Sequence, residues 1–309
     1  MKNREPEYIS PRATDEPNLA TKEPESPQTQ PSLLQTRPVK TRTRKVLTNT
    51  ALRRGIVSVV VFLILWQIGA GFDEMFGITM PFVGLVPTPV AVFSGAVQVV
   101  TDLTFWTSWY LSFRRVLFGF LAAMVVGIPF GLLMATNRTT KGIFFPLFEV
   151  LRPIPPLAWV PAAIIFWPTQ ELSIVFVTFL GAFYTIVINV VGGAEEIDKR
   201  FIRCARSMGA SGWAIFRRVI FPATMPSIAT GAVVGMGITW QVVVAAEMIS
   251  GGGEGGTGGG LGFLVWNSYV AGVIPQVVVG MISLGIAGYI SSEILRALTD
   301  RMMPWKRVS

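Results

Sequence analysis

EEIDKRFIRCARSMGASGWAIFRRVIFPATMPS, residues 195–227, lies between two long apolar stretches and decides how this chain is organised. Its apolar residues recur at helical spacing: Ile197, Phe201, Cys204, Ala205 and Met208. Its basic residues fall on the other side of such a helix: Lys199, Arg200, Arg203 and Arg206. Apolar and charged faces that repeat at this period predict an amphipathic helix.

A turn and a second helix follow along the sequence. Gly209 ends the first helix, and Ser211 is suited to cap a short second one. The apolar residues of this second helix are Trp213, Phe216 and Ile220. Pro222 and Pro226 then mark the start of the next apolar stretch. The segment is predicted to be a helix–turn–helix outside the membrane; the alternative is a pair of interfacial helices resting on lipid headgroups.

The composition indicates a membrane protein. The chain is 51% hydrophobic and 14% charged, whereas about 25% of the residues of a soluble domain are charged. A spanning helix needs ~20 apolar residues. Stretches near this length fall at 55–72, 111–136, 144–167, 172–192, 223–249 and 273–298. The sequence therefore predicts an all-α membrane protein with six transmembrane helices.

Basic residues outside these stretches indicate the orientation. The positive-inside rule assigns the basic N-terminal tail to the cytoplasm. With six spans, segments 137–143, 193–221 and 299–309 are then cytoplasmic, and 73–110, 168–171 and 250–272 are external. Every Lys and Arg of these segments lies on the predicted inner side, and the outer segments carry only acids. Topology therefore explains the net charge of +8, and nucleic-acid binding is not needed.

The domain organisation is simple. Residues 1–54 are rich in Pro, Thr, Glu, Lys and Arg and are expected to be a disordered, basic cytoplasmic tail. The first apolar stretch begins near Ile56, which is too deep for a secretory signal peptide, so it is expected to be a retained span. Residues 55–300 form the predicted transmembrane domain, with the loop 195–221 inside it, and 301–309 form a cytoplasmic end.

The segment 195–227 is similar to the EAA loop of binding-protein-dependent ABC importer permeases. That loop has Glu-Ala-Ala, then Gly, an aliphatic residue and Leu-Pro. The corresponding residues here are Arg203, Cys204, Ala205, Gly209, Val219, Phe221 and Pro222. The resemblance implies a type I importer fold and a coupling helix that docks on a cytoplasmic ATPase. The implied coupling residues are Phe201, Arg203, Cys204, Ala205, Met208, Gly209, Ala210 and Pro222. Arg203 departs from the usual Glu of the loop, so the contact of that Glu does not carry over.

The resemblance covers about residues 55–300 and is greatest to the nitrate, sulfonate, taurine and bicarbonate branch. Its further motifs are LVPTPVAVF, SFRRVLFGFLAAMVVGIPFGLLMA, LRPIPPLAWVPAAIIFW and VVVAAEMISGG…GLGFLVWNSYVAG. It implies inward transport of a small anion by alternating access in the bacterial inner membrane. The implied partners are cytoplasmic ATP-binding subunits, a second permease subunit in a homodimer, and an extracytoplasmic solute-binding protein. No G-x-x-x-x-G-K-[ST] pattern occurs, so ATP is expected to bind the partner subunit. This chain is expected to bind no cofactor.

Polar residues and prolines within the spans are candidates for the translocation pathway, because polar groups in hydrocarbon are costly unless they face a cavity or a partner. The candidates are Arg152, Pro155, Pro156, Trp159, Asn189, Trp240, Gln241 and Glu247. Packing is the alternative role for each of them. Arg114 and Arg115, near the outer end of the second span, are expected to snorkel. Gly231 and Gly235 form a face suited to close helix contact, for example with a second copy.

Other chemistries find little support. The chain has no His and one Cys, so no metal site, disulfide or catalytic residue is predicted. A G-x-G-x-x-G match at Gly253, Gly255 and Gly258 follows a membrane span rather than a strand, so a flexible external loop is expected there. An ATP-independent secondary transporter or channel remains the second hypothesis, in which Glu247 is the suitable buried acid. A membrane-bound enzyme is the third.

Overall fold

The computed structural model describes residues 49–71, 86–251 and 259–303. Nearly all of the predicted tail 1–54 lies outside the described residues, as do the Gly253–Gly258 match and most of the end 301–309. The chain divides into one unit from Met1 to Arg54 and a second from Gly55 to Ser309. All the candidate functional residues belong to the second unit.

Every regular element in the described residues is helical. In chain order these are α1 (Asn49–Ala70), α3 (Pro89–Val100), α4 (Leu103–Thr136), α5 (Arg138–Leu151), η1 (Pro156–Trp159), α6 (Val160–Phe166), α7 (Gln170–Glu195), α8 (Lys199–Ser207), α9 (Gly212–Ile215), η2 (Phe216–Ile220), α10 (Phe221–Ile249), α11 (Gly260–Val270) and α12 (Ile274–Met302). Five of the described helices are long and apolar enough to cross a membrane, and α5 with η1–α6 makes a sixth when this bent pair is counted as one span. The predicted all-α membrane fold is confirmed.

Close packing of α4 on α7 depends on a stripe of small residues. Gly119, Ala123, Gly127 and Gly131 recur every fourth residue on α4, so they share one face of the helix. A Cβ added to Gly131 would lie 2.9 Å from the Cβ of Val190 on α7. The two backbones approach so closely because these residues have little or no side chain, as is usual for helix pairs in membranes.

The predicted small-residue face of α10 packs against α7 of the same chain. A Cβ added to Gly231 would lie 2.7 Å from the Cβ of Asn189, and one added to Gly235 would lie 3.5 Å from Cγ1 of Ile186. Both glycines are buried. The close helix contact is therefore confirmed, but the suggestion of a second copy as its partner is wrong, because α7 already covers this face.

The third predicted span is strongly bent. The axes of α5 and η1–α6 differ by 89°, and the break falls in the proline-rich sequence between Leu151 and Pro156. Proline lacks a backbone N–H and clashes with the preceding helical turn, so successive prolines end a helix. Two backbone bonds close the bend, from the N–H of Ile154 to the carbonyl of Leu151 and from that of Ala158 to the carbonyl of Pro155.

Two segments predicted as external connections contain helices: α3 lies in 73–110, and α11 lies in 250–272. Pro89 starts α3 after Thr88, whose hydroxyl accepts a bond from the N–H of Ala91. A capping threonine followed by proline is a regular helix start, which explains the motif LVPTPVAVF. Helix α4 begins at Leu103 rather than 111 because Asp102 caps it. Bonds from the N–H and hydroxyl of Thr104 hold the pKa of Asp102 below its ordinary value.

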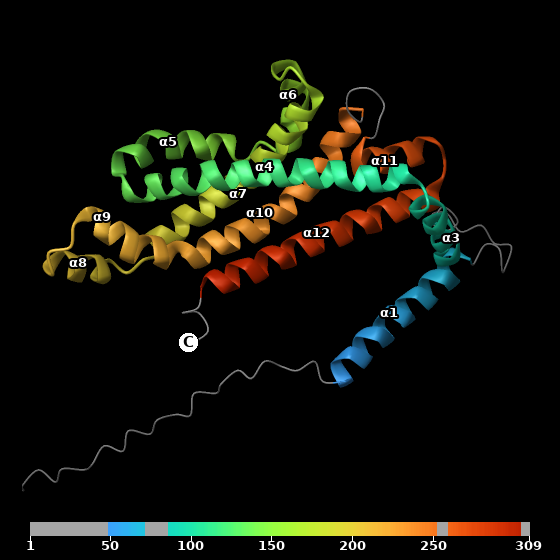
Figure 1. The fold of residues 1–309 in the computed structure, drawn as a ribbon, viewed down its shortest axis with the longest axis horizontal. Helices are drawn as coiled ribbons and strands as arrows, with labels where there is room; N and C mark the ends of the chain where they lie inside the picture. The colour runs from blue at the N-terminus through green and yellow to red at the C-terminus, as the bar shows by residue number, and fades with distance from the viewer. Residues whose placement is uncertain (1–48, 72–85, 252–258, 304–309) are drawn as a thin grey trace, which may run out of the picture. The chain divides into compact units, whose positions relative to one another are not determined.

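Helices α4, α7, α10 and α12 run between two ends of the second unit (Figure 1). Helices α8 and α9 lie at the end where α4 gives way to α5, and α3 and α11 lie where α4 begins. We call these the α8 end and the α11 end. Basic residues of several segments gather at the α8 end: Arg138, Lys141, Lys199, Arg200, Arg203, Arg206, Arg217 and Arg218.

Candidate functional site

Helix α8 begins at a capped N-terminus. The side chain of Asp198 accepts a bond from the backbone N–H of Arg200 at 2.8 Å, and its other oxygen pairs with Nε of Arg200 at 2.8 Å. Asp is among the preferred N-cap residues because its carboxylate satisfies an otherwise unpaired N–H and favours the positive end of the helix dipole. The amphipathic helix predicted here is confirmed as α8.

The turn after α8 has a backbone conformation that favours glycine. Gly209 has φ of +77°, in the left-handed region. Its N–H bonds to the carbonyl of Arg206 at 2.9 Å, and the N–H of Ala210 bonds to the carbonyl of Ala205 at 3.0 Å. This pair of bonds is the Schellman motif, which satisfies the last carbonyls of a helix and usually places glycine at this position. The predicted role of Gly209 in ending the helix is therefore confirmed.

The second short helix continues without a gap into α10. Ser211 caps it, as predicted, by accepting a bond from the N–H of Ala214 at 3.3 Å. A π-helical turn follows, in which the N–H of Phe221 bonds to the carbonyl of Phe216. Pro222 lies directly after this turn, where its missing N–H prevents a regular α-helical bond. Residues 212–249 thus form one helical segment with an irregular turn near its start.

The α8–α9 element presents large apolar side chains to its surroundings. Phe201 is 66% exposed, Met208 80% and Trp213 70%, whereas Ala205 and Ile215 are buried within the chain. Exposed apolar groups rimmed by charge are typical of a surface that binds another protein. We call these exposed residues the α8–α9 surface: Phe201, Arg203, Cys204, Met208 and Trp213.

The pathway candidates of the third span lie around its bend. Arg152 caps the end of α5 and is exposed, as is Pro155. Pro156 starts η1, and Trp159 at its end packs partly against the hydrophobic core. Asn189, on α7, donates its side-chain amide to the carbonyl of Thr185 at 2.8 Å. None of these residues lines the α10–α12 cavity that Trp240 and Gln241 border.

Trp240 and Gln241 line a cavity of about 430 Å³ between α10 and α12. Trp240 is otherwise buried and donates its indole N–H to Ser291 on α12 at 3.2 Å. Gln241 is exposed. Across from them, α12 supplies Tyr289, Ser292, Glu293 and Arg296, among other residues.

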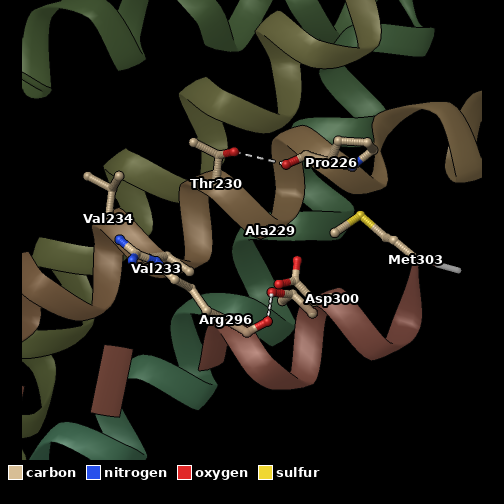
Figure 2. Close-up of a pocket in the computed structure, with 9 residues that line it drawn as sticks. Pro226, Ala229, Thr230, Val233, Val234, Arg296, Asp300 and Met303 are labelled. Atoms are coloured by element: carbon tan, nitrogen blue, oxygen red, sulfur yellow. Dashed lines mark hydrogen bonds between the residues drawn. The ribbon is translucent and has the colours of Figure 1, made fainter. Parts of the chain in front are cut away.

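A second cavity, of about 310 Å³, lies nearer the α8 end between the same two helices (Figure 2). It is lined by Pro226, Ala229, Thr230, Val233 and Val234 of α10 and by Arg296, Thr299, Asp300 and Met303. Figure 2 shows Thr230 with its hydroxyl bonded to the carbonyl of Pro226, at 3.0 Å, rather than to α12. Arg296 lines both cavities, so they follow one another along the α10–α12 groove.

Glu247, also a pathway candidate, lies in a buried polar cluster near the α11 end. Its Oε1 pairs with Nη1 of Arg115 at 2.8 Å, and both side chains are fully buried. Nη1 of Arg115 also bonds to the carbonyl of Gly259 at 3.2 Å. Glu171, from α7, accepts from Nε of Arg115 at 3.1 Å and pairs with its Nη2. The expectation that Arg115 snorkels is wrong, because two carboxylates hold its guanidinium inside the protein.

Backbone groups at the start of α11 complete this cluster. The N–H of Gly262 donates to Oε2 of Glu247 at 2.9 Å, and the N–H of Leu261 donates to the hydroxyl of Ser112 at 2.8 Å. Ser112 in turn donates to Glu247. A buried carboxylate is tolerated only when its hydrogen-bonding capacity is met in this way. The cluster therefore joins α4, α7, α10 and α11.

Two glycines let the backbone reach the buried acid. Gly260 has φ of +79°, and a Cβ there would overlap the carboxylate of Glu247. A Cβ on Gly262 would overlap the carbonyl of Val244. The end of the glycine-rich run was predicted to be part of a flexible loop. Its backbone instead packs closely against Glu247 and Val244. Sequence reasoning missed Ser112, Glu171, Gly260 and Gly262; the signal was a glycine run followed by a helix pattern close after a buried acid.

Replacing Gly260 by alanine is expected to lower the thermal stability far more than replacing Gly272. Gly272 has nearly the same φ, +73°, but open space around it. Gly272→Ala thus carries only the backbone strain, roughly 1–2 kcal/mol. Gly260→Ala adds overlap with Glu247, for a total of roughly 3 kcal/mol or more. Melting curves of the two purified variants in one detergent make the comparison. Equal melting temperatures would contradict a tight contact at Gly260.

Known proteins resemble this chain over most of its length. Residues 127–307 match the family described as binding-protein-dependent transport system inner membrane component. The nitrate import permease protein NrtB of Synechocystis sp. is 32% identical over 263 residues, covering 81% of this chain and 89% of that protein. The taurine transport system permease protein TauC of Escherichia coli K12 is 30% identical over 250 residues, covering 81% and 88%. A solved bacterial ABC transporter involved in the import of the acidic polysaccharide alginate aligns with a TM-score of 0.52 at 12% identity, covering 82% and 98%, and so shows a shared fold alone.

Proposed function

This chain belongs to the family of binding-protein-dependent transport system inner membrane components, and on that premise we propose that it is the permease subunit of an ATP-driven importer for a small anion. Its proposed partners are cytoplasmic ATP-binding subunits, an extracytoplasmic solute-binding protein and a second copy of the permease. ATP binds the partner, in keeping with the lack of a phosphate-binding loop sequence in this chain.

The α8–α9 surface is the observation that carries this proposal. It combines three largely exposed apolar side chains, Phe201, Met208 and Trp213, with a basic residue, Arg203. A short, capped helix with such a surface suits insertion into a groove of a soluble partner, with the apolar groups as anchors. The ATP-binding subunit is that partner. Arg203 stands where the loop usually has Glu. The groove of this partner is therefore expected to be acidic where it meets Arg203.

The orientation follows from the basic residues. We assign the α8 end to the cytoplasm, where positively charged loops are retained. Arg114 and Arg115 lie toward the α11 end and are both paired with acids, so they do not oppose this assignment. Both chain termini are then cytoplasmic.

Motion of the partner reaches the membrane through α10. Helix α9, the π-helical turn and α10 are continuous, so a displacement of the α8–α9 element moves α10 as well. Helix α10 carries Trp240 and Gln241 on the α10–α12 groove and Glu247 in the buried cluster. We assign the groove to the translocation pathway and the displacement of α10 to alternating access. The bend at Pro155 and Pro156, next to Arg152 and Trp159, is a second candidate for a moving part.

The proposal of an anionic solute derives from the nitrate relative, and it is in keeping with the taurine relative because taurine carries a sulfonate group. Purification of the chain from its native membrane with bound partners tests the assembly. ATP-dependent uptake of nitrate, bicarbonate or taurine into proteoliposomes by that complex is the expected result. Uptake by the purified chain without any ATP-binding subunit would instead support the secondary transporter, and turnover of a solute without transport would support an enzyme.

Filling the α10–α12 groove is expected to reduce uptake without unfolding the protein. Gly237 lines the larger cavity, and a Cβ added there meets nothing within 4 Å. Gly237→Leu should therefore be accommodated and even favour the helix by about 1 kcal/mol, while the side chain occupies part of the cavity. Uptake in proteoliposomes is expected to fall several-fold. Gly192→Leu on α7, also in open space, is the control. Undiminished uptake by Gly237→Leu would contradict a pathway there.

A further inference from the structure

Two guanidinium groups converge on one partly exposed carboxylate near the α11 end. Nη2 of Arg114 donates to Oε2 of Glu171 at 3.0 Å, and Nε of Arg115 donates to the same oxygen at 3.1 Å. Nη2 of Arg115 pairs with the other oxygen, Oε1. The carboxylate is thus held by the flat edge of one arginine and by a second arginine from the side. Flat, two-oxygen recognition is the geometry in which arginine binds oxyanions most strongly.

The two acids that bind Arg115 are held very differently. Glu247 is fully buried and also accepts bonds from Ser112 and Gly262. The side chain of Glu171 is 33% exposed, and within the described residues its bonds come from Arg114 and Arg115 alone. Glu247 is therefore the enclosed partner of Arg115, whereas Glu171 has an open side into which a change of rotamer could take its carboxylate.

Charge balance shows what the vacated site would accept. With Glu171 in place, two arginines face two carboxylates and the cluster is neutral. Without it, Glu247 still compensates Arg115, and Arg114 leaves one net positive charge. Arg115 is not left as an isolated buried ion, which would be very costly. The cluster can thus exchange one monovalent anion for another at constant charge.

We propose that Arg114 and Arg115 form a binding site for a monovalent planar oxyanion, such as nitrate or bicarbonate, and that Glu171 occupies it in the present conformation. The inference rests on the proposed function for the class of solute. Nitrate and bicarbonate present two coplanar oxygens as a carboxylate does, so either can take the position of the Glu171 head group. Glu171 also lies in the first turn of α7, where the helix dipole favours a negative charge. On the orientation proposed above, the site faces the side from which the solute arrives.

The decisive variant is Glu171→Gln, which removes the competing charge and keeps the shape of the side chain. Nitrate and bicarbonate binding is measured by isothermal titration on the purified complex, with chloride keeping the ionic strength constant. Glu171→Gln is expected to bind both anions about tenfold more tightly than the unmodified protein, equivalent to about 1.4 kcal/mol. Adding Arg114→Gln to this variant is expected to abolish the gain. Arg115 remains, but Glu247 already compensates its charge.

Glu195→Gln is the matched control, because Glu195 lies on the same helix, is 43% exposed and pairs with a base, Lys141. Equal affinities in the unmodified protein, Glu171→Gln and Glu195→Gln would overturn the proposal, as would a gain that survives Arg114→Gln. ATP-dependent uptake is recorded on the same preparations. Normal uptake together with an unchanged affinity of Glu171→Gln overturns only the oxyanion site. A gain in affinity in a complex that transports no solute supports the oxyanion site and refutes the proposed importer.

Discussion

A Gly209→Val variant is expected to hydrolyse ATP in complex with its partner but to transport solute at less than about a tenth of the normal rate, a loss equivalent to about 1.4 kcal/mol of coupling or more. Gly209 has φ of +77° and closes the turn between α8 and α9. A β-branched residue in this conformation costs roughly 1–2 kcal/mol, so the turn rearranges and displaces the α8–α9 surface. The readouts are ATP hydrolysis and uptake in the same proteoliposomes.

Two companion variants separate this effect from a loss of folding. Gly212→Val places the same side chain three residues later, also in open space, where φ is not positive. It is expected to couple normally. Gly209→Asn is expected to recover most of the transport, because asparagine tolerates the left-handed region. Full transport by Gly209→Val would remove the turn from the coupling path.

Replacing Arg115 by methionine is expected to prevent recovery of folded protein or to lower its melting temperature severely. The substitution leaves Glu247, fully buried, without its ionic partner. Removing one member of a buried pair costs about 3–5 kcal/mol, which is a large part of the stability of a typical domain. Fluorescence-detected size-exclusion chromatography after a temperature series measures the effect in detergent extracts.

Arg114→Met is the control for this experiment, because the neighbouring arginine is 39% exposed and, in the part of the chain that the structure describes, its ion pair is with Glu171. An exposed pair contributes about 0–1 kcal/mol. The double variant Arg115→Met with Glu247→Gln is expected to recover part of the loss, since the amide keeps bonds to Ser112 and Gly262 without a buried charge. Equal stability of Arg115→Met and Arg114→Met would show that the buried cluster does not hold these helices together.

The spans and the α8–α9 element could be predicted because their causes are local. A run of apolar residues long enough for the bilayer identifies a spanning helix whatever its neighbours are. The same holds for a helix with a capping Asp198, a Gly209 after its last turn and a Ser211 before the next helix, since each of these bonds closes within a few residues. Predicted span limits differed most at α4, where the cap at Asp102 precedes a turn rich in polar residues.

The pathway candidates were harder to predict, because burial and lining depend on which helices become neighbours. Glu247 was chosen as a polar residue near the end of a span, and it lies instead in an ion cluster. Arg115 was expected to reach the interface, yet it is fully buried. Gln241 and Trp240 do border a cavity, but α12, across the groove, supplies most of its wall.

The sequence by itself determined that this chain is a helical membrane protein with its basic residues on one side and an amphipathic helix–turn–helix between two spans. Only the tertiary structure decided that Arg115 meets Glu171, 56 residues away, and Glu247, 132 residues away. It also decided that the backbone around Gly260 closes over the acid. Hydropathy and helical period are properties of a short segment, whereas a buried charge is stable only beside partners that the packing of distant helices supplies.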